Sequence, residues 1–209
     1  MCDETGLERP RFAALWRALG GDGGSCFDTL ARAYGSGERH YHTDEHIREC
    51  LAWLDRVQHL AARPAELEAA IWFHDAVYDT ASKDNEARSA GLWRDAATAA
   101  GIEPAVIERV AELIVGTAHT RQSATADARL LADIDLGILG AAPARYRRYE
   151  QAIRREYESV PEPAFRRGRA AVLAAFLERT AIYQTPYFYE RLERQARENL
   201  AEAIGALTS

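Results

Sequence analysis

The sequence of 209 residues has little lysine, little cysteine and no long apolar run. Lys83 is its only lysine, so almost all of its positive charge comes from arginine. The three cysteines, Cys2, Cys26 and Cys50, are far apart and form no Cys-x-x-Cys pair. This spacing argues against a disulfide framework and against a thiolate zinc site. No apolar run approaches the roughly 20 residues that are needed to span a bilayer.

The charge balance disfavours two classes of partner. Nonspecific binding to a nucleic acid polymer or to an anionic membrane requires a basic face, whereas the formal net charge of this chain is −6. The first ten residues, MCDETGLERP, are polar and lack the apolar core of a signal peptide. Together with the cysteine pattern, which suits a reducing compartment, these features predict a cytoplasmic protein, and the net charge leaves room for a small anionic ligand held by a few arginines.

Alternating strand patterns joined by Asn-Gly or Asp-Gly turns are also absent, so we expect no β-strands. Apolar residues recur instead with helical spacing, and prolines, together with Thr43, Asp84 and Thr185, stand where helices would begin. We predict an all-α protein with a single helical bundle domain over residues 1–209. After two shorter helices near the N-terminus, the expected helices cover residues 44–60, 64–78, 85–100, 104–119, 143–159, 162–182 and 186–206.

Histidine is scarce, yet three of the six histidines stand in one short segment, RHYHTDEHI, at residues 39–47. Within it, His42 and His46 are four positions apart, which places both on one face of the start of a helix. A simple alternative is that this pair only belongs to a solvated helix start.

Two other segments contain polar groups in apolar surroundings. His74 and Asp75 interrupt the apolar helix IWFHDAVYD, and Asp133 and Asp135 interrupt LLADIDLGIL. A carboxylate in such a segment is costly unless it is paired, hydrogen-bonded or bound to a metal. The first pair could be a buried structural pair, and one of the two later aspartates could cap a helix. A single cation that collects these groups with the histidines would satisfy all of them. A mixed set of imidazole and carboxylate suits one divalent ion of Mn, Fe, Co, Ni, Mg or Zn.

The order His…His-Asp…Asp on helices resembles the HD-domain superfamily of metal-dependent phosphohydrolases, and in particular a bacterial subgroup of predicted HD hydrolases. The resemblance covers roughly residues 30–200 and rests on the segments RHYHTDEHI, FHDAVYDT, DNEARSA, TAH, DIDLGILG and FRRGRAAVL. It implies an HD core over roughly residues 30–140, with the metal inside and C-terminal helices 143–206 packed on it. The implied activity is hydrolysis of a small phosphate ester or anhydride, such as a nucleotide.

Carried over residue by residue, the resemblance implies four metal ligands: His46, His74, Asp75 and Asp135. The stretch YHTDEH is similar to the YHNxxHA stretch of cyclic-nucleotide phosphodiesterases, in which the second histidine binds metal and the first protonates the leaving group. His42 would therefore be a general acid. Related members favour the second aspartate of the Asp-x-Asp as the ligand, and Asp133 remains the alternative.

Four further residues are candidates for substrate contact. Arg39 and Lys83 would bind phosphate oxygens, Arg169 is part of the family pattern, and His119 would contact substrate or bind a second metal. Glu86 would orient a ligand or the attacking water. Simple alternatives are a solvated loop lysine for Lys83 and an exposed first-turn acid for Glu86.

The sequence thus predicts a metal-dependent phosphohydrolase with a small phosphorylated substrate. Two alternatives stay open. One is a non-catalytic metal-binding or ligand-binding regulatory protein, and the other is a di-iron oxygenase of the HD fold, which would need a second set of histidines. The substrate, the physiological metal and the oligomeric state do not follow from the sequence.

Overall fold

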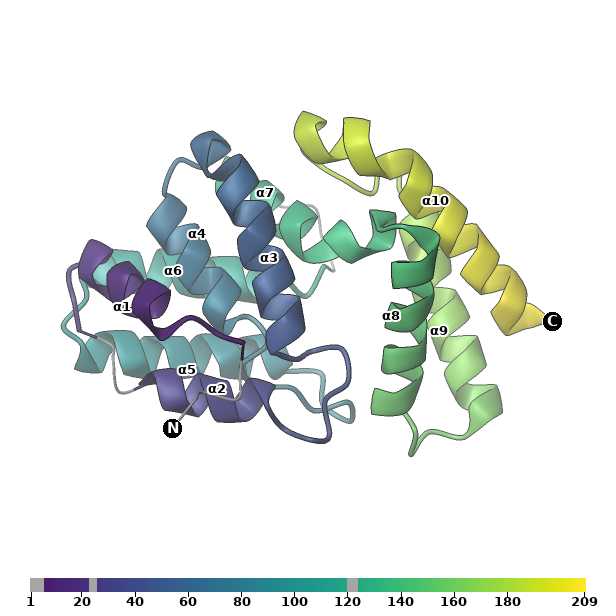
Figure 1. Cartoon of the computed structure of the whole chain (residues 1–209), viewed down its shortest axis with the longest axis horizontal. Helices are drawn as coiled ribbons and strands as arrows, with labels where there is room; N and C mark the ends of the chain where they lie inside the picture. The colour runs from purple at the N-terminus through teal and green to yellow at the C-terminus, as the bar shows by residue number, and fades with distance from the viewer. Residues whose placement is uncertain (1–5, 23–25, 120–123) are drawn as a thin grey trace. The chain divides into compact units, whose positions relative to one another are not determined.

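The structure is a computed structural model that describes residues 6–22, 26–119 and 124–209. All regular secondary structure in these residues is helical, which confirms the all-α class (Figure 1). Within the same residues, no helix combines the length and the apolar character that crossing a membrane would require. The helices in chain order are α1 (Arg9–Ala18), α2 (Phe27–Tyr34), α3 (Asp44–Val57), η2 (Gln58–Leu60), α4 (Pro64–Phe73), α5 (Asn85–Ala99), α6 (Pro104–Gly116), α7 (Ala126–Asp135), η3 (Leu136–Gly140), α8 (Pro143–Glu156), α9 (Glu162–Leu177) and α10 (Pro186–Thr208).

The chain divides into two compact units, Met1–Ile134 and Asp135–Ser209. This division falls near the border that we expected between the HD core and the C-terminal helices. That the two parts form one domain over residues 1–209 stays a prediction.

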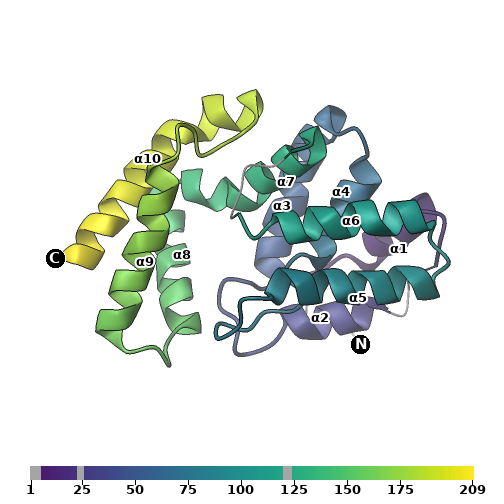
Figure 2. The same ribbon diagram turned by 180° about the vertical axis from the view of Figure 1, so that it is seen from behind.

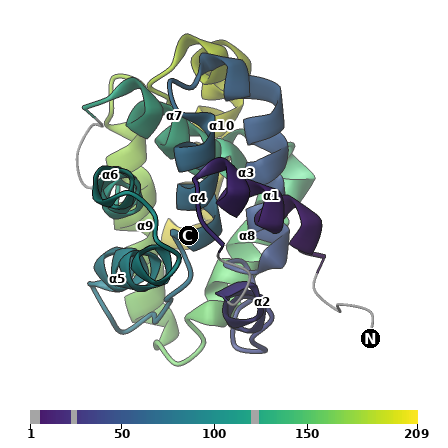
Figure 3. The same cartoon turned by 90° about the vertical axis from the view of Figure 1, so that its left-hand side faces the viewer.

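The first unit is built around the apolar helix α4. Fully buried aromatic rings connect it to its neighbours: the ring centroids of Phe12 and Trp72 are 5.0 Å apart, and those of Phe73 and Trp93 are 5.2 Å apart. Helices α5 and α6 run side by side, and α6 also contacts α4 (Figures 2 and 3). Because Phe73 is the last residue of α4, this aromatic core also fixes the position of His74 and Asp75, which follow it.

The second unit is held together by α10, which packs on both α9 and η3 (Figure 2). The side-chain amide of Asn199 donates to the carbonyl oxygens of Leu139 and Ala141, at 2.8 Å each. Gly140 permits this close approach, because a Cβ atom there would lie 2.5 Å from Cβ of Leu192.

Helix ends differ from the prediction more than helix starts do. Helix α4 ends at Phe73 instead of residue 78, so His74 and Asp75 do not interrupt a helix but lie at its C-terminal end. Helices α6, α8 and α9 also end earlier than expected. After α4 the apolar pattern continues into a turn in which His74 and Ala76 are buried, which is why periodicity alone overestimates this helix.

The predicted caps are correct in position but not in their bonding. Thr43, Asp84 and Thr185 precede α3, α5 and α10 as expected. None of the three side chains makes a capping hydrogen bond. Side-chain caps therefore do not stabilise these three helix starts.

Candidate metal centre

His46 is held on the buried face of α3. Its side chain is 2% exposed, and the same face carries the buried residues Ile47, Cys50 and Leu51. The ring of Tyr41 covers it at a centroid distance of 4.8 Å. A histidine among these neighbours has little access to water, so its ring nitrogens must find partners within the protein.

His74 and Asp75 are placed by the end of α4. The backbone N–H of His74 still donates to the carbonyl of Ala70, and its side chain is 2% exposed. Asp75 follows as the chain leaves the helix, and 18% of its side chain is exposed. The pair therefore has a buried imidazole and a carboxylate with one accessible edge.

Three ligand atoms from these residues converge. Nε2 of His46 lies 3.1 Å from Nε2 of His74, and Oδ2 of Asp75 lies 3.4 Å from the first and 3.0 Å from the second. Donors that bind one divalent transition metal at about 2.0–2.2 Å, with angles of about 90–110°, lie roughly 2.8–3.6 Å apart. The three separations fall in this range, so His46, His74 and Asp75 could hold a metal ion together.

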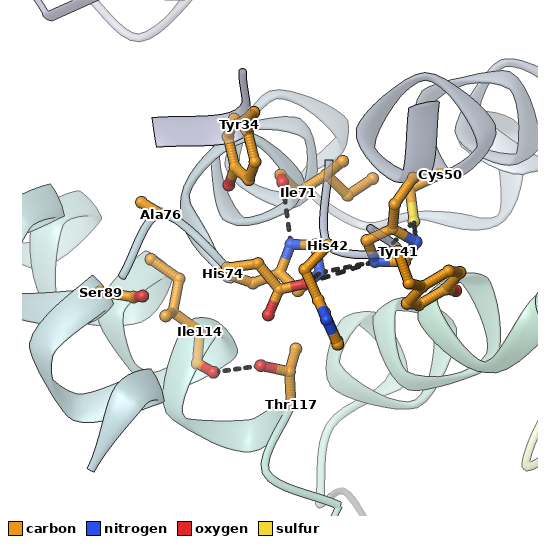
Figure 4. Close-up of polar contacts among 12 residues, drawn as sticks. Tyr34, Tyr41, His42, Cys50, Ile71, His74, Ala76, Ser89, Ile114 and Thr117 are labelled. Carbon is orange, nitrogen blue, oxygen red and sulfur yellow. Dashed lines mark hydrogen bonds and ion pairs between the residues drawn. The ribbon is translucent and has the colours of Figure 1, made fainter. Parts of the chain in front are cut away.

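The hydrogen bond at the other ring nitrogen of His74 supports the same conclusion. Nδ1 of His74 lies 2.9 Å from the carbonyl oxygen of Ile71 (Figure 4). A carbonyl only accepts, so Nδ1 carries the hydrogen, and in the neutral ring Nε2 presents a lone pair. That lone pair faces an oxygen of Asp75 at 3.0 Å, an arrangement that is repulsive unless a proton or a metal cation lies between the two atoms. An Nδ1–H donated to a backbone carbonyl is also the usual support of a metal-binding histidine.

The carboxyl group of Asp75 is kept ionised by its neighbours. Burial by itself would raise its pKa, but His74, His42 and His46 outweigh burial and hold the pKa of Asp75 well below its ordinary value. A carboxylate that is charged throughout the physiological pH range is a suitable metal ligand.

No family model, no curated protein and no solved structure matches this chain. The resemblance to the HD superfamily therefore rests on the motifs alone. What the structure adds is a helical chain with a buried histidine and aspartate cluster that could bind a metal, and this is compatible with an HD fold.

His42, the predicted general acid, lies beside this group. Its ring is stacked on Tyr78 at a centroid distance of 3.9 Å and is 6.1 Å from the ring of His46. His42 is half-buried, and its ring also lies 5.0 Å from that of Tyr41, centroid to centroid. Its role in proton transfer stays a prediction.

Arg39, a predicted phosphate ligand, is also next to the group. Its guanidinium donates to three backbone carbonyls, those of His42, Asp75 and Ala76. Its contact with substrate stays a prediction, but its bonding in the structure is to the protein itself.

The other candidates of the first unit lie on separate elements. Lys83 is exposed in the turn before α5, and Glu86 is half-buried in the first turn of α5. His119 follows α6 with a left-handed backbone conformation, φ 52°. Asp133 is fully buried near the end of α7. The roles that we predicted for these residues stay predictions.

Asp135 and Arg169 belong to the second unit. Asp135 ends α7 and precedes η3, but its side chain makes no capping hydrogen bond to η3. Arg169 donates to both carboxylate oxygens of Glu150, at 2.7 and 3.1 Å. A separate hollow of about 360 Å³ in this unit is lined by α8, α9 and α10, and neither residue lines it. The predicted roles of Asp135 as a metal ligand and of Arg169 as a substrate contact stay predictions.

Cys50 is a ligand-type residue that the sequence reasoning did not select. Its sulfur lies 3.8 Å from both ring nitrogens of His46, and its side chain is buried. The signal was available, because residues four apart share one face of a helix. A lone cysteine gives no thiolate-site signal by itself, since such sites are predicted from Cys-x-x-Cys pairs.

Proposed function

We propose that this protein is a metal-dependent phosphohydrolase of the HD type that acts on a small phosphate ester or anhydride, such as a nucleotide. The observation that supports the proposal best is the convergence of two imidazole nitrogens and one carboxylate oxygen within 3.0–3.4 Å of one another. Imidazole and carboxylate suit manganese, iron, cobalt, nickel or zinc better than they suit calcium.

His46, His74 and Asp75 would hold the metal, with Asp135 as the proposed fourth ligand. The chemistry that a bound divalent ion supplies is polarisation of a phosphoryl oxygen and a lower pKa for a water molecule. The exposed edge of Asp75 would leave the substrate a route to the site, while the two histidines stay buried.

His42 would serve the leaving group. When water attacks phosphorus, the bond from phosphorus to the leaving oxygen breaks and its electron pair stays on that oxygen. An imidazolium at His42 would donate the proton that this oxygen needs, as histidine can do near neutral pH. The stack on Tyr78 would keep one face of the ring covered and its nitrogen atoms oriented.

The proposal is tested by metal analysis of the purified protein, followed by phosphate release from a panel of nucleotides and sugar phosphates. We expect bound metal, loss of phosphate release on chelation, and recovery with manganese, cobalt or nickel.

Phosphate release that is unchanged after long dialysis against a chelator would contradict the mechanism. Bound metal without hydrolysis of any substrate would favour the alternative of a regulatory protein that binds metal without turnover.

A further inference from the structure

Arg39 connects two segments that carry residues of the candidate metal centre. One nitrogen of its guanidinium donates to the carbonyl oxygens of Asp75, at 2.7 Å, and of His42, at 3.3 Å. The other terminal nitrogen donates to the carbonyl of Ala76 at 3.0 Å. One side chain thus joins the loop before α3 to the turn after α4, across 36 positions of sequence.

The carbonyl groups of Asp75 and Ala76 lie in the turn beyond Phe73, the last residue of α4. A backbone carbonyl that is shielded from water is costly without a hydrogen-bond partner. Arg39 supplies donors from another segment, at the point where the chain carries the side chain of Asp75 to His74 and His46. The aromatic rings of Tyr34 and Tyr78 flank the guanidinium at 5.4 and 5.8 Å, which restricts its position further.

We propose that Arg39 is a positioning residue for the metal centre rather than a phosphate ligand. It holds the turn of Asp75 and the loop of His42 at a fixed separation, so that Oδ2 of Asp75 stays 3.0–3.4 Å from the two imidazole nitrogens. This inference rests on the proposed metal site, and it reassigns a residue for which the sequence alone suggested contact with substrate.

Two substitutions test it. Arg39→Lys keeps the charge but replaces the planar fork with a single ammonium, which cannot reach all three carbonyls in the same way. Arg39→Met removes the donors altogether. Loss of a residue that supports metal ligands typically weakens metal binding about 10–100-fold, so we expect a loss of that size for Arg39→Met and a smaller loss for Arg39→Lys.

Arg11→Met is the matched control. Arg11 is also a half-buried arginine of the first unit, and it bonds to Asp55 and Glu68. Among the described residues, no contact joins Arg11 to Nε2 of His46, Nε2 of His74 or Oδ2 of Asp75. Its loss should destabilise the unit but leave metal affinity within about twofold of the wild type.

The measurement is calorimetric titration of the metal-free proteins with Mn²⁺ and with Co²⁺, together with circular dichroism to confirm folding. If Arg39→Met does not fold, Arg39→Lys replaces it in the test. A further measurement is whether added guanidinium ion restores metal binding to Arg39→Ala. Weaker metal binding in the Arg39 variants, with Arg11→Met near the wild type, would support the inference.

Three results would overturn it. One is unchanged metal affinity in all Arg39 variants, and another is an equal loss in Arg11→Met. The third is unchanged metal affinity with a raised KM for substrate, which would restore the role in phosphate binding. Failure of the wild type itself to bind either metal would instead refute the proposed function, and the inference with it.

Discussion

At the scale of single residues, the candidate centre depends on the position of one hydrogen in each imidazole ring. The carbonyl of Ile71 fixes that position for His74 and leaves Nε2 facing the carboxylate of Asp75. His46 also contacts the sulfur of Cys50, which lies 3.8 Å from both of its ring nitrogens.

The roles of His42 and His46 can be separated by substitution. His46→Ala removes one of the metal donors, so metal content and phosphate release should both fall sharply. His42→Ala should keep its metal and lose roughly 10²–10⁴-fold in kcat, the usual contribution of a general acid. The measurements are metal content by mass spectrometry and steady-state kinetics.

His59→Ala is the control for this pair, since His59 is exposed in η2. The loss in His42→Ala should be smaller with p-nitrophenyl phosphate, because its leaving group departs without a proton. Loss of metal in His42→Ala and its retention in His46→Ala would reverse the assignment.

A second prediction at this scale concerns the thiol of Cys26. Burial raises the pKa of Cys26 to about 11, compared with an ordinary value of about 8.5–9. The thiolate is the reactive form, so alkylation by iodoacetamide at pH 8 should be about 100-fold slower in the native protein than in urea. Because the folded-state pKa is the higher one, the stability contributed by the buried, protonated thiol of Cys26 is fully present below about pH 9. It is lost as the pH rises from 9 toward 11.

Peptide mass spectrometry can measure the rate at Cys26 separately from the rates at the other cysteines. Equal rates in native and unfolded protein would contradict the assigned burial.

At the scale of elements, α4 determines where the site lies. Seven of its ten residues are buried, as expected for a helix that is largely apolar all round. Its last residue, Phe73, contacts the rings of Trp16 and Trp93. The His-Asp pair is therefore attached directly to the most completely buried helix of the first unit.

We predict that Phe73→Ala lowers the free energy of unfolding by about 3–5 kcal/mol, the usual result of removing a buried phenylalanine. Because the end of α4 would also lose its anchor, metal affinity should fall as well. Urea denaturation and metal titration measure the two effects. Leu60→Ala is the control, because Leu60 is 45% exposed and should change stability by less than about 0.5 kcal/mol. A similar effect of the two substitutions would show that the aromatic core does not anchor this end of α4.

At the scale of the whole molecule, metal binding should stabilise the fold. A metal that binds only the folded state adds about 2.7 kcal/mol at a concentration 100 times its Kd. We therefore expect Mn²⁺ or Co²⁺ to raise the Tm of the metal-free protein, and a chelator to reverse the rise. Differential scanning calorimetry measures the shift. His74→Ala should show none, whereas His59→Ala should respond as the wild type does. A wild-type Tm that is unchanged at saturating metal would argue against a cation at this centre.

Several features of this protein follow from local sequence. The all-α class and most helix starts could be predicted because apolar spacing and proline act over a few residues. The candidate ligands His74 and Asp75 could be selected because polar groups in apolar segments require partners, whereas the choice of His46 over His42 came from the resemblance to the YHNxxHA stretch. Neither inference needs knowledge of residues that are distant in the sequence.

Other features were decided only by the tertiary structure. The bonding of Arg39 depends on contacts between segments 36 positions apart, and the end of α4 at Phe73 did not follow from the apolar spacing. From its neighbours in sequence, Arg39 suggested a free cation that could bind phosphate. In the fold its donors are used by the backbone carbonyls of His42, Asp75 and Ala76, because the turn after α4 lies within their reach and burial makes an unpaired carbonyl costly.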